Sequence, residues 1–207
     1  MQTKRYDSFA GTLAILAGIG GPLYSVAFVF LYLFQLAPAL GLTLASLLLL
    51  VGGVLSATVM VALYQHVREA DSGFAILALV ISLVGAFGGA THGAYDLANQ
   101  FHPPVSDVLG TNNYPNMVDP RGLATFGFAG IGLVLFAWLM SQGKTFPSRL
   151  AQLGYLAGAL NIAIYLARLI ILTPSNPIVL VVAGVTGLIV NPAFFIWLGL
   201  RLRAMAR

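Results

Sequence analysis

Four polar residues near the end of one apolar segment have the types and spacing of a small binding or proton-transfer site. His92, Asp96 and Asn99 are four and three residues apart, so on a helix they share one face, which Tyr95 borders. A histidine beside a carboxylate can transfer a proton or hold a polar group. Because such a stripe gains nothing from facing lipid, we expect it to face other helices or water.

A further residue of this kind is Arg168, which lies inside another apolar run. At about 1.5 Å per residue, it lies about 7–8 Å below the end of its segment at Thr173. His92 and Asp96 lie about 4–10 Å below a matching end near Asn99. Asp96 is the only acidic residue inside the apolar segments as we delimit them, and a guanidinium suits a carboxylate. We therefore expect an ion pair between Arg168 and Asp96, with His92 close by.

Three interpretations of Arg168 remain open, and the first is favoured. In a structural lock, Asp96 neutralises Arg168 and joins two helices. In a ligand site, Arg168 holds an anionic group, while His92 and Asp96 tune the site. In the third, the Arg168 side chain extends to the lipid headgroups without a protein partner.

Two asparagines lie deeper in the apolar segments. Asn161 is about two turns below Arg168 on the same helix face. Asn191 and Pro192 interrupt the last apolar segment near its middle, where proline frees a backbone carbonyl and kinks a helix. Hydrogen bonds between helices are the favoured role of both asparagines. The alternative is a polar path that runs inward from Arg168.

The elements that must position these residues are membrane spans. The chain has 207 residues, of which 59% are hydrophobic and 8% are charged. Soluble domains carry about 25% charged residues. The mean hydropathy of +0.92 also indicates a membrane protein. The chain has no cysteine, which excludes disulfides, thiolate catalysis and cysteine-ligated metal centres.

Six apolar segments reach the length of about 20 residues that a spanning helix needs. We therefore predict an all-α, polytopic membrane protein that forms one domain, a bundle of six transmembrane helices. The connection over residues 99–121 is the longest and is too short for a separate domain. The predicted spans are 9–34, 41–64, 74–98, 122–141, 150–172 and 178–200.

The distribution of lysine and arginine predicts the orientation, because cytoplasmic segments are enriched in these residues. Six spans place both termini on one side, and on that side eight basic residues lie outside the spans; the opposite side has only Arg121. We expect cytoplasmic termini, an extracytoplasmic loop at 99–121 and a bacterial-type plasma membrane. The eight are Lys4, Arg5, Arg68, Lys144, Arg149, Arg201, Arg203 and Arg207.

Glycine pairs spaced four residues apart favour close contact between helices. Gly89 and Gly93 form one such pair, and Gly154 and Gly158 form another. Packing within one bundle is the favoured interpretation. A seam between two copies of the chain is the alternative.

No catalytic motif is present: the chain has no GxSxG elbow, no P-loop and no paired carboxylates within the spans. A metal site built from His92, Asp96, His102 and a loop aspartate is disfavoured, because Arg168 nearby would oppose a cation. We expect no metal, no cofactor and no nucleic acid partner.

The leading hypothesis for function is a non-enzymatic binding or accessory subunit of a membrane assembly. The alternative is a transporter or solute-capturing subunit with an outer-facing site around Arg168, Asp96 and His92. A membrane enzyme acting on a lipid is the third hypothesis. Expected partners are the lipid bilayer and either other membrane subunits or a second copy of the chain. The candidate ligand-binding residues are Arg168, Asp96, His92, Tyr95, Asn99, Asn161 and Asn191.

Overall fold

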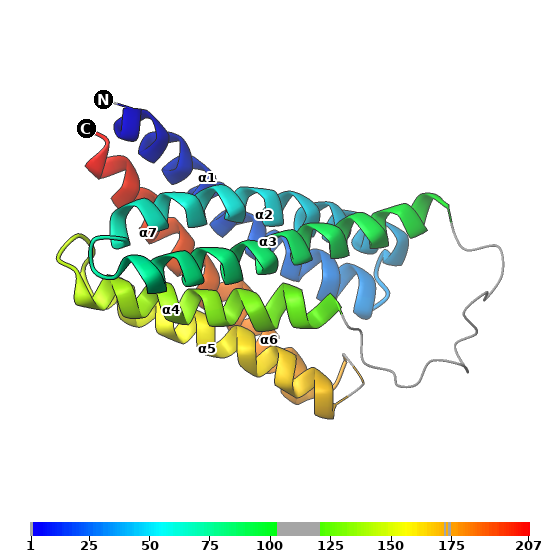
Figure 1. Ribbon diagram of the computed structural model, residues 1–207. Coiled ribbons are helices and arrows are strands. Elements are labelled where there is room, and N and C mark those ends of the chain that lie inside the picture. Colours follow the sequence, from blue (N-terminus) through cyan, green and yellow to red (C-terminus); the bar gives the residue numbers. More distant parts are fainter. Residues whose placement is uncertain (1, 103–120, 172, 174) are drawn as a thin grey trace.

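The computed structural model describes residues 2–102, 121–171, 173 and 175–207, and the described chain is helical (Figure 1). Six helices are long and apolar enough to cross a membrane, as the sequence predicts. They extend past the predicted spans by as many as five residues, at Lys4 against 9 and at Met205 against 200. The six are Lys4–Leu33, Pro38–Val67, Ser72–Phe101, Leu123–Gln142, Ser148–Ile170 and Pro177–Met205.

Three of the six spans change from α-helix to π-helix along their length. The elements, with π-helices labelled η, are α1 (Gln2–Ser25), η1 (Val26–Leu33), α2 (Pro38–Val67), α3 (Ser72–Phe101), η3 (Leu123–Phe128), α4 (Ala129–Gln142), α5 (Ser148–Ile170), α6 (Pro177–Val185), η4 (Thr186–Val190) and α7 (Asn191–Met205). Consecutive spans are antiparallel neighbours (Figure 1). Contacts between α1 and α7 close the bundle into a ring.

Both termini lie at the same end of the bundle (Figure 1), where the Lys4 Nζ donates a hydrogen bond to the Arg207 carbonyl at 3.3 Å. We divide the bundle near the midpoints of its spans into two halves. The termini half comprises residues 2–17, 53–86, 133–159 and 190–207. The far half comprises the described residues of 18–52, 87–101, 121–132 and 160–189.

The hydrophobic core lies in the termini half. Its largest fully buried side chains include Phe136, Phe194 and Leu63, which come from three different spans. The other members of the core cluster are also in this half, and most are small or medium-sized aliphatic residues. Tight packing of this kind, without lipid between the helices, holds membrane helices together.

Small residues allow the helices to approach closely. A Cβ added to Gly93 of α3 would collide with the Ser46 carbonyl of α2. A Cβ added to Gly158 of α5 would lie 2.7 Å from the Gly130 carbonyl of α4. Gly89 has only ordinary contacts at 3.8 Å. The predicted use of these glycines for packing within one bundle is therefore confirmed for Gly93 and Gly158.

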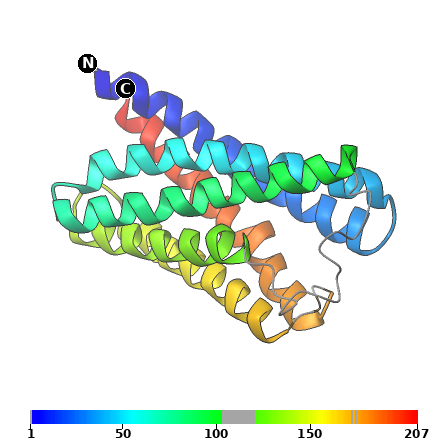
Figure 2. The ribbon, with the colours of Figure 1, turned by 45° about the vertical axis from the view of Figure 1, so that its right-hand side comes forward.

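The far half is less regular. All three π-helices lie in it, with η4 ending at its border. The predicted interruption at Asn191 coincides with a change of helix type: η4 ends at Val190, and α7 begins at Asn191 with Pro192 in its first turn. The span remains helical across this junction, and Pro192 has no N–H to donate to the preceding turn. The ribbons of η1 and α6 diverge toward this end of the bundle, whereas α1 and α7 lie side by side near the termini (Figure 2).

Candidate functional site

A large cavity lies mainly in the far half of the bundle and reaches into the termini half. Its volume is about 1140 Å³, and residues from all six spans line it. Ordinary small-molecule pockets measure about 300–1,000 Å³. Along α2 the lining runs from Leu42 to Met60, which corresponds to about 27 Å of helix. The cavity ends at Met60 and Leu133, which belong to the packed core. The cavity is therefore long, and it is closed on the side of the termini.

The wall of the cavity is mainly apolar. Tyr24, Phe28 and Tyr32 form an aromatic row along α1 and η1, with ring centroids 5.8 and 5.6 Å apart. The hydroxyl groups of Ser46 and Thr186, which also line the cavity, donate to carbonyls of their own helices at 2.7 and 2.6 Å. Because these hydroxyls are satisfied locally, they add little polarity to the wall.

Ser82, at the closed end of the cavity, is different. Its side chain is buried, and its Oγ has no hydrogen-bond partner within the described chain. A buried hydroxyl without a partner is destabilising, so such groups are rare. The deep end of the cavity thus offers a hydroxyl group that no described residue satisfies.

Three glycines mark where the cavity reaches the helix backbone. A Cβ added to Gly20 of α1, Gly52 of α2 or Gly184 of α6 would have no atom within 4 Å. All three glycines line the cavity. The neighbouring Gly53, in contrast, faces α3, where an added Cβ would collide with Ala86. Two adjacent residues of α2 therefore face different surroundings: Gly52 faces open space, and Gly53 packs tightly against α3.

The charged side chains of the lining gather near its open end. They are Asp96, Arg121 and Arg168, together with the imidazole of His92. His92 and Asp96 lie one turn apart in the second half of α3, as predicted. Arg121 directly precedes the fourth span, and Arg168 lies in the last turn of α5.

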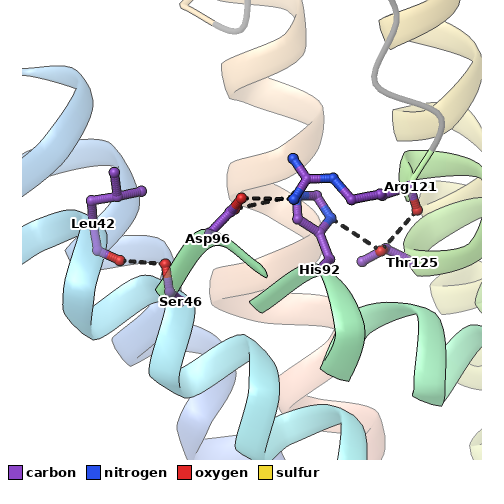
Figure 3. Close-up of polar contacts among 6 residues, drawn as sticks. All are labelled: Leu42, Ser46, His92, Asp96, Arg121 and Thr125. Atoms are coloured by element: carbon purple, nitrogen blue, oxygen red, sulfur yellow. Dashed lines mark hydrogen bonds and ion pairs between the residues drawn. The ribbon is translucent and has the colours of Figure 1, made fainter. Parts of the chain in front are cut away.

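Asp96 pairs with Arg121 rather than with Arg168. The Arg121 Nη1 donates to the Asp96 Oδ1 at 2.7 Å, and the His92 Nε2 lies 3.4 Å from the Asp96 Oδ2 (Figure 3). Contacts between described residues include no ion pair of Arg168 with Asp96, so the predicted pairing is corrected. An ion pair between two spans is present, but it joins α3 to the start of the fourth span.

Both ring nitrogens of His92 face acceptors. The Thr125 hydroxyl donates to the Arg121 carbonyl at 3.0 Å, so toward His92 Nδ1, at 3.2 Å, it can only accept (Figure 3). The His92 Nε2 faces the Asp96 carboxylate. The imidazole thus bridges Thr125 and Asp96 within the cluster.

Arg168 lies closer to the end of its helix than predicted. Helix α5 ends at Ile170 rather than at 172, which leaves Arg168 about 3 Å from the end. Its Nη1 donates to the Ile171 carbonyl at 2.7 Å, so the guanidinium caps its own helix. The same side chain lines the cavity. This position explains how a cation is tolerated in an apolar run.

The remaining predicted residues differ in their positions. Asn99 lines the cavity, but Tyr95 does not: it is 54% exposed, and its ring lies 4.8 Å from the Arg121 guanidinium carbon. Asn161 donates to the Asn191 Oδ1 at 3.2 Å, which confirms the predicted hydrogen bond between helices. Both asparagines also line the cavity.

A second histidine–aspartate pair lies at the other end of the bundle, and the sequence analysis missed it. Asp7 of α1 is 3% exposed, and its Oδ1 lies 3.0 Å from the Nε2 of His66 of α2. The ring of Phe146 packs edge-on against His66 at 6.0 Å. Asp7 lies in the first candidate span, so Asp96 is not the only acidic residue in the spans. A predicted start at residue 9 excluded Asp7.

Arg121 was also underestimated, because it was counted in the loop. The spacing of Arg121 and Thr125 by four residues matches that of His92 and Asp96, and this was the available signal. His102 follows the end of α3 and is exposed. The loop aspartates at 107 and 119 lie outside the described residues. Within the described residues, no three potential metal ligands of the His, Cys, Asp or Glu type converge.

Comparison of the chain with protein-family models, with curated proteins and with solved structures found no match.

Proposed function

We propose that this protein is a non-enzymatic membrane protein that captures an amphipathic ligand in the cavity of its far half. The cavity carries the proposal. The cavity of about 1140 Å³ is partly open at the surface of the bundle, and its mainly apolar lining suits an apolar occupant.

The polar cluster at one end of the cavity favours a ligand with a polar part and an apolar part. Specific pockets are typically apolar, with a few convergent polar groups that fix the orientation of the ligand. Here the charged groups lie near one end, and the aromatic row of Tyr24, Phe28 and Tyr32 lines the wall. An amphipathic molecule matches this division. The same function suits a solute-capturing subunit of a larger membrane assembly.

The orientation of the chain in the membrane is part of this proposal. The excess of lysine and arginine near the termini favours cytoplasmic termini. The charged cluster then lies near the extracytoplasmic surface, and the ligand enters from that side or from the outer leaflet. A bacterial-type plasma membrane is the setting that we propose.

Filling the cavity tests the proposal. Gly52→Leu adds a side chain where a Cβ meets open space, and Gly184→Leu does so from a different helix. The control is Ala159→Leu, which adds the same side chain to an exposed position of α5 that does not line the cavity. Each protein is purified in mild detergent, and the retained small molecules are identified by native mass spectrometry.

We expect the natural chain and the Ala159→Leu variant to retain the same amphipathic species. Gly52→Leu and Gly184→Leu should lose most of it while remaining folded. Retention of an identical set of molecules by all four proteins would show that the cavity is not the binding site.

A further inference from the structure

We infer that the ligand carries an anionic group, a phosphate or a carboxylate, and that Arg121 and Arg168 bind this group at the far end of the cavity. This inference rests on the proposed function, because it names the class of ligand that the cavity would capture. The apolar part of the ligand would extend along the aromatic row toward Ser82.

The charges of the lining carry the inference. Among the described lining residues, two guanidinium groups stand against one carboxylate. No described lining residue near the closed end is charged. A ligand with one anionic group therefore has one favourable orientation, with that group near Arg121 and Arg168.

The two guanidinium groups are held in place by contacts with the protein. The Arg121 Nη1 bonds to Asp96, and its guanidinium also lies over the ring of Tyr95. The Arg168 Nη1 bonds to the Ile171 carbonyl. A guanidinium has several N–H donors in one plane, so it can bind the oxygens of an anion while keeping an anchoring contact. Asp96 acts here as a positioning residue for Arg121.

The shape of the cavity favours an amphiphile over a free anion. A small anion needs only the charged end, whereas the lining continues from Leu42 as far as Met60. Free inorganic phosphate and a phosphate headgroup nevertheless share the same chemistry. The experiment must therefore separate these two sources of the anion.

Binding of four probes to delipidated protein in non-ionic detergent provides the test. The probes are radiolabelled oleyl phosphate, oleate, oleyl alcohol and inorganic phosphate. Arg168→Gln removes one guanidinium, and Arg168→Lys keeps its charge. Arg68→Gln is the matched control, because Arg68 is an exposed arginine at the end of α2 in the termini half. Gly52→Leu reports on the cavity.

We expect oleyl phosphate and oleate to bind at least about tenfold more tightly than oleyl alcohol, which is the usual effect of charge-assisted hydrogen bonds. Arg168→Gln should remove most of this difference and leave the binding of oleyl alcohol unchanged. Arg168→Lys should retain part of the difference, and Arg68→Gln should retain all of it. Gly52→Leu should weaken all three oleyl probes.

Other outcomes separate the two proposals. If the three oleyl probes bind with equal affinity and Gly52→Leu weakens the binding of all three, the ligand has no anionic group bound by the arginines. The proposal that the cavity captures an amphipathic ligand would still stand. Oleyl binding that Gly52→Leu leaves unchanged would overturn the capture function itself. Inorganic phosphate that binds as tightly as oleyl phosphate would show a site for a free anion and overturn the amphiphile. If Arg168→Gln does not fold, the comparison of Arg168→Lys with the natural chain decides.

Discussion

The same six spans build two unlike halves, one packed and one hollow. In the termini half, Phe136, Leu63 and Phe194 fill the space between helices and are at most 1% exposed. In the far half, the helices surround about 1140 Å³ of cavity, and three spans turn into π-helix. Short π-helical segments occur frequently at functional sites. The comparison indicates that the packed half supplies stability, which leaves the far half free to hold a ligand.

The two histidine–aspartate pairs show the same contrast. The pair in the termini half, Asp7 with His66, is 3.0 Å apart, and the Asp7 side chain is 4% exposed. The pair in the far half, Asp96 with His92, is 3.4 Å apart, and the Asp96 side chain is 26% exposed. Identical residue types therefore serve a buried contact in one half and an accessible cluster in the other.

The largest loss of stability should come from removing a buried side chain from the packed half. Phe136→Ala should lower the free energy of unfolding by about 3–5 kcal/mol, because it leaves a cavity among buried side chains. Phe28→Ala, in the cavity wall, should cost only about 1 kcal/mol, mainly from the lost stacking on Tyr24. Thermal unfolding in detergent measures both variants. Equal losses would show that the two halves contribute equally to stability.

Breaking the two pairs should have unequal effects. Asp7→Asn should destabilise the protein by about 3 kcal/mol, because it removes one partner of a buried pair. Asp96→Asn should cost about 1 kcal/mol, since solvent reaches this pair. Denaturation of both variants under the same conditions measures the difference. A larger loss in Asp96→Asn would mean that the far cluster is mainly a structural lock.

The neighbouring glycines of α2 give a sharper test. Gly53→Ala should destabilise the protein by about 1–3 kcal/mol, because the added methyl group collides with Ala86. Gly52→Ala meets open space and should be neutral or stabilise by up to about 1 kcal/mol, owing to the higher helix propensity of alanine. Unfolding temperatures of the two variants, compared with the natural chain, check the prediction. Equal destabilisation by both variants would show that Gly52 does not face open space.

Most of the fold could be predicted from the sequence, because the length and hydropathy of a span are local properties. The six spans and the interruption at Asn191 follow from such patterns. The ends of the helices could not be placed as well, since polar residues such as Asp7 continue a helix beyond its apolar part. That error hid the pair of Asp7 with His66, and the same kind of counting left Arg121 in the loop.

The candidate site could be predicted only in part. Matching depths brought His92, Asp96 and Arg168 to one end of the bundle, and all three line the same cavity. The partner of Asp96 was wrong, because depth does not tell which of two nearby arginines points toward a carboxylate. The cavity itself has no sequence signal, since it arises from the absence of packing between distant segments.

The smallest change in stability is expected at Ser82, which lies at the closed end of the cavity. Ser82→Ala removes a buried hydroxyl without a hydrogen-bond partner in the described chain, so it should be neutral or stabilise the ligand-free protein by up to about 1 kcal/mol. Unfolding of delipidated protein measures this effect. A clear loss of stability would mean that Ser82 bonds to water or to an occupant at the closed end of the cavity.

The most direct test is an experimental density map of the protein purified with its native lipids. We predict elongated density inside the cavity, running beside α2 from Leu42 toward Met60 and ending within hydrogen-bond distance of Arg121 and Arg168. A far half closed by protein side chains, or a cavity that contains only water, would contradict the division into a packed half and a ligand-holding half.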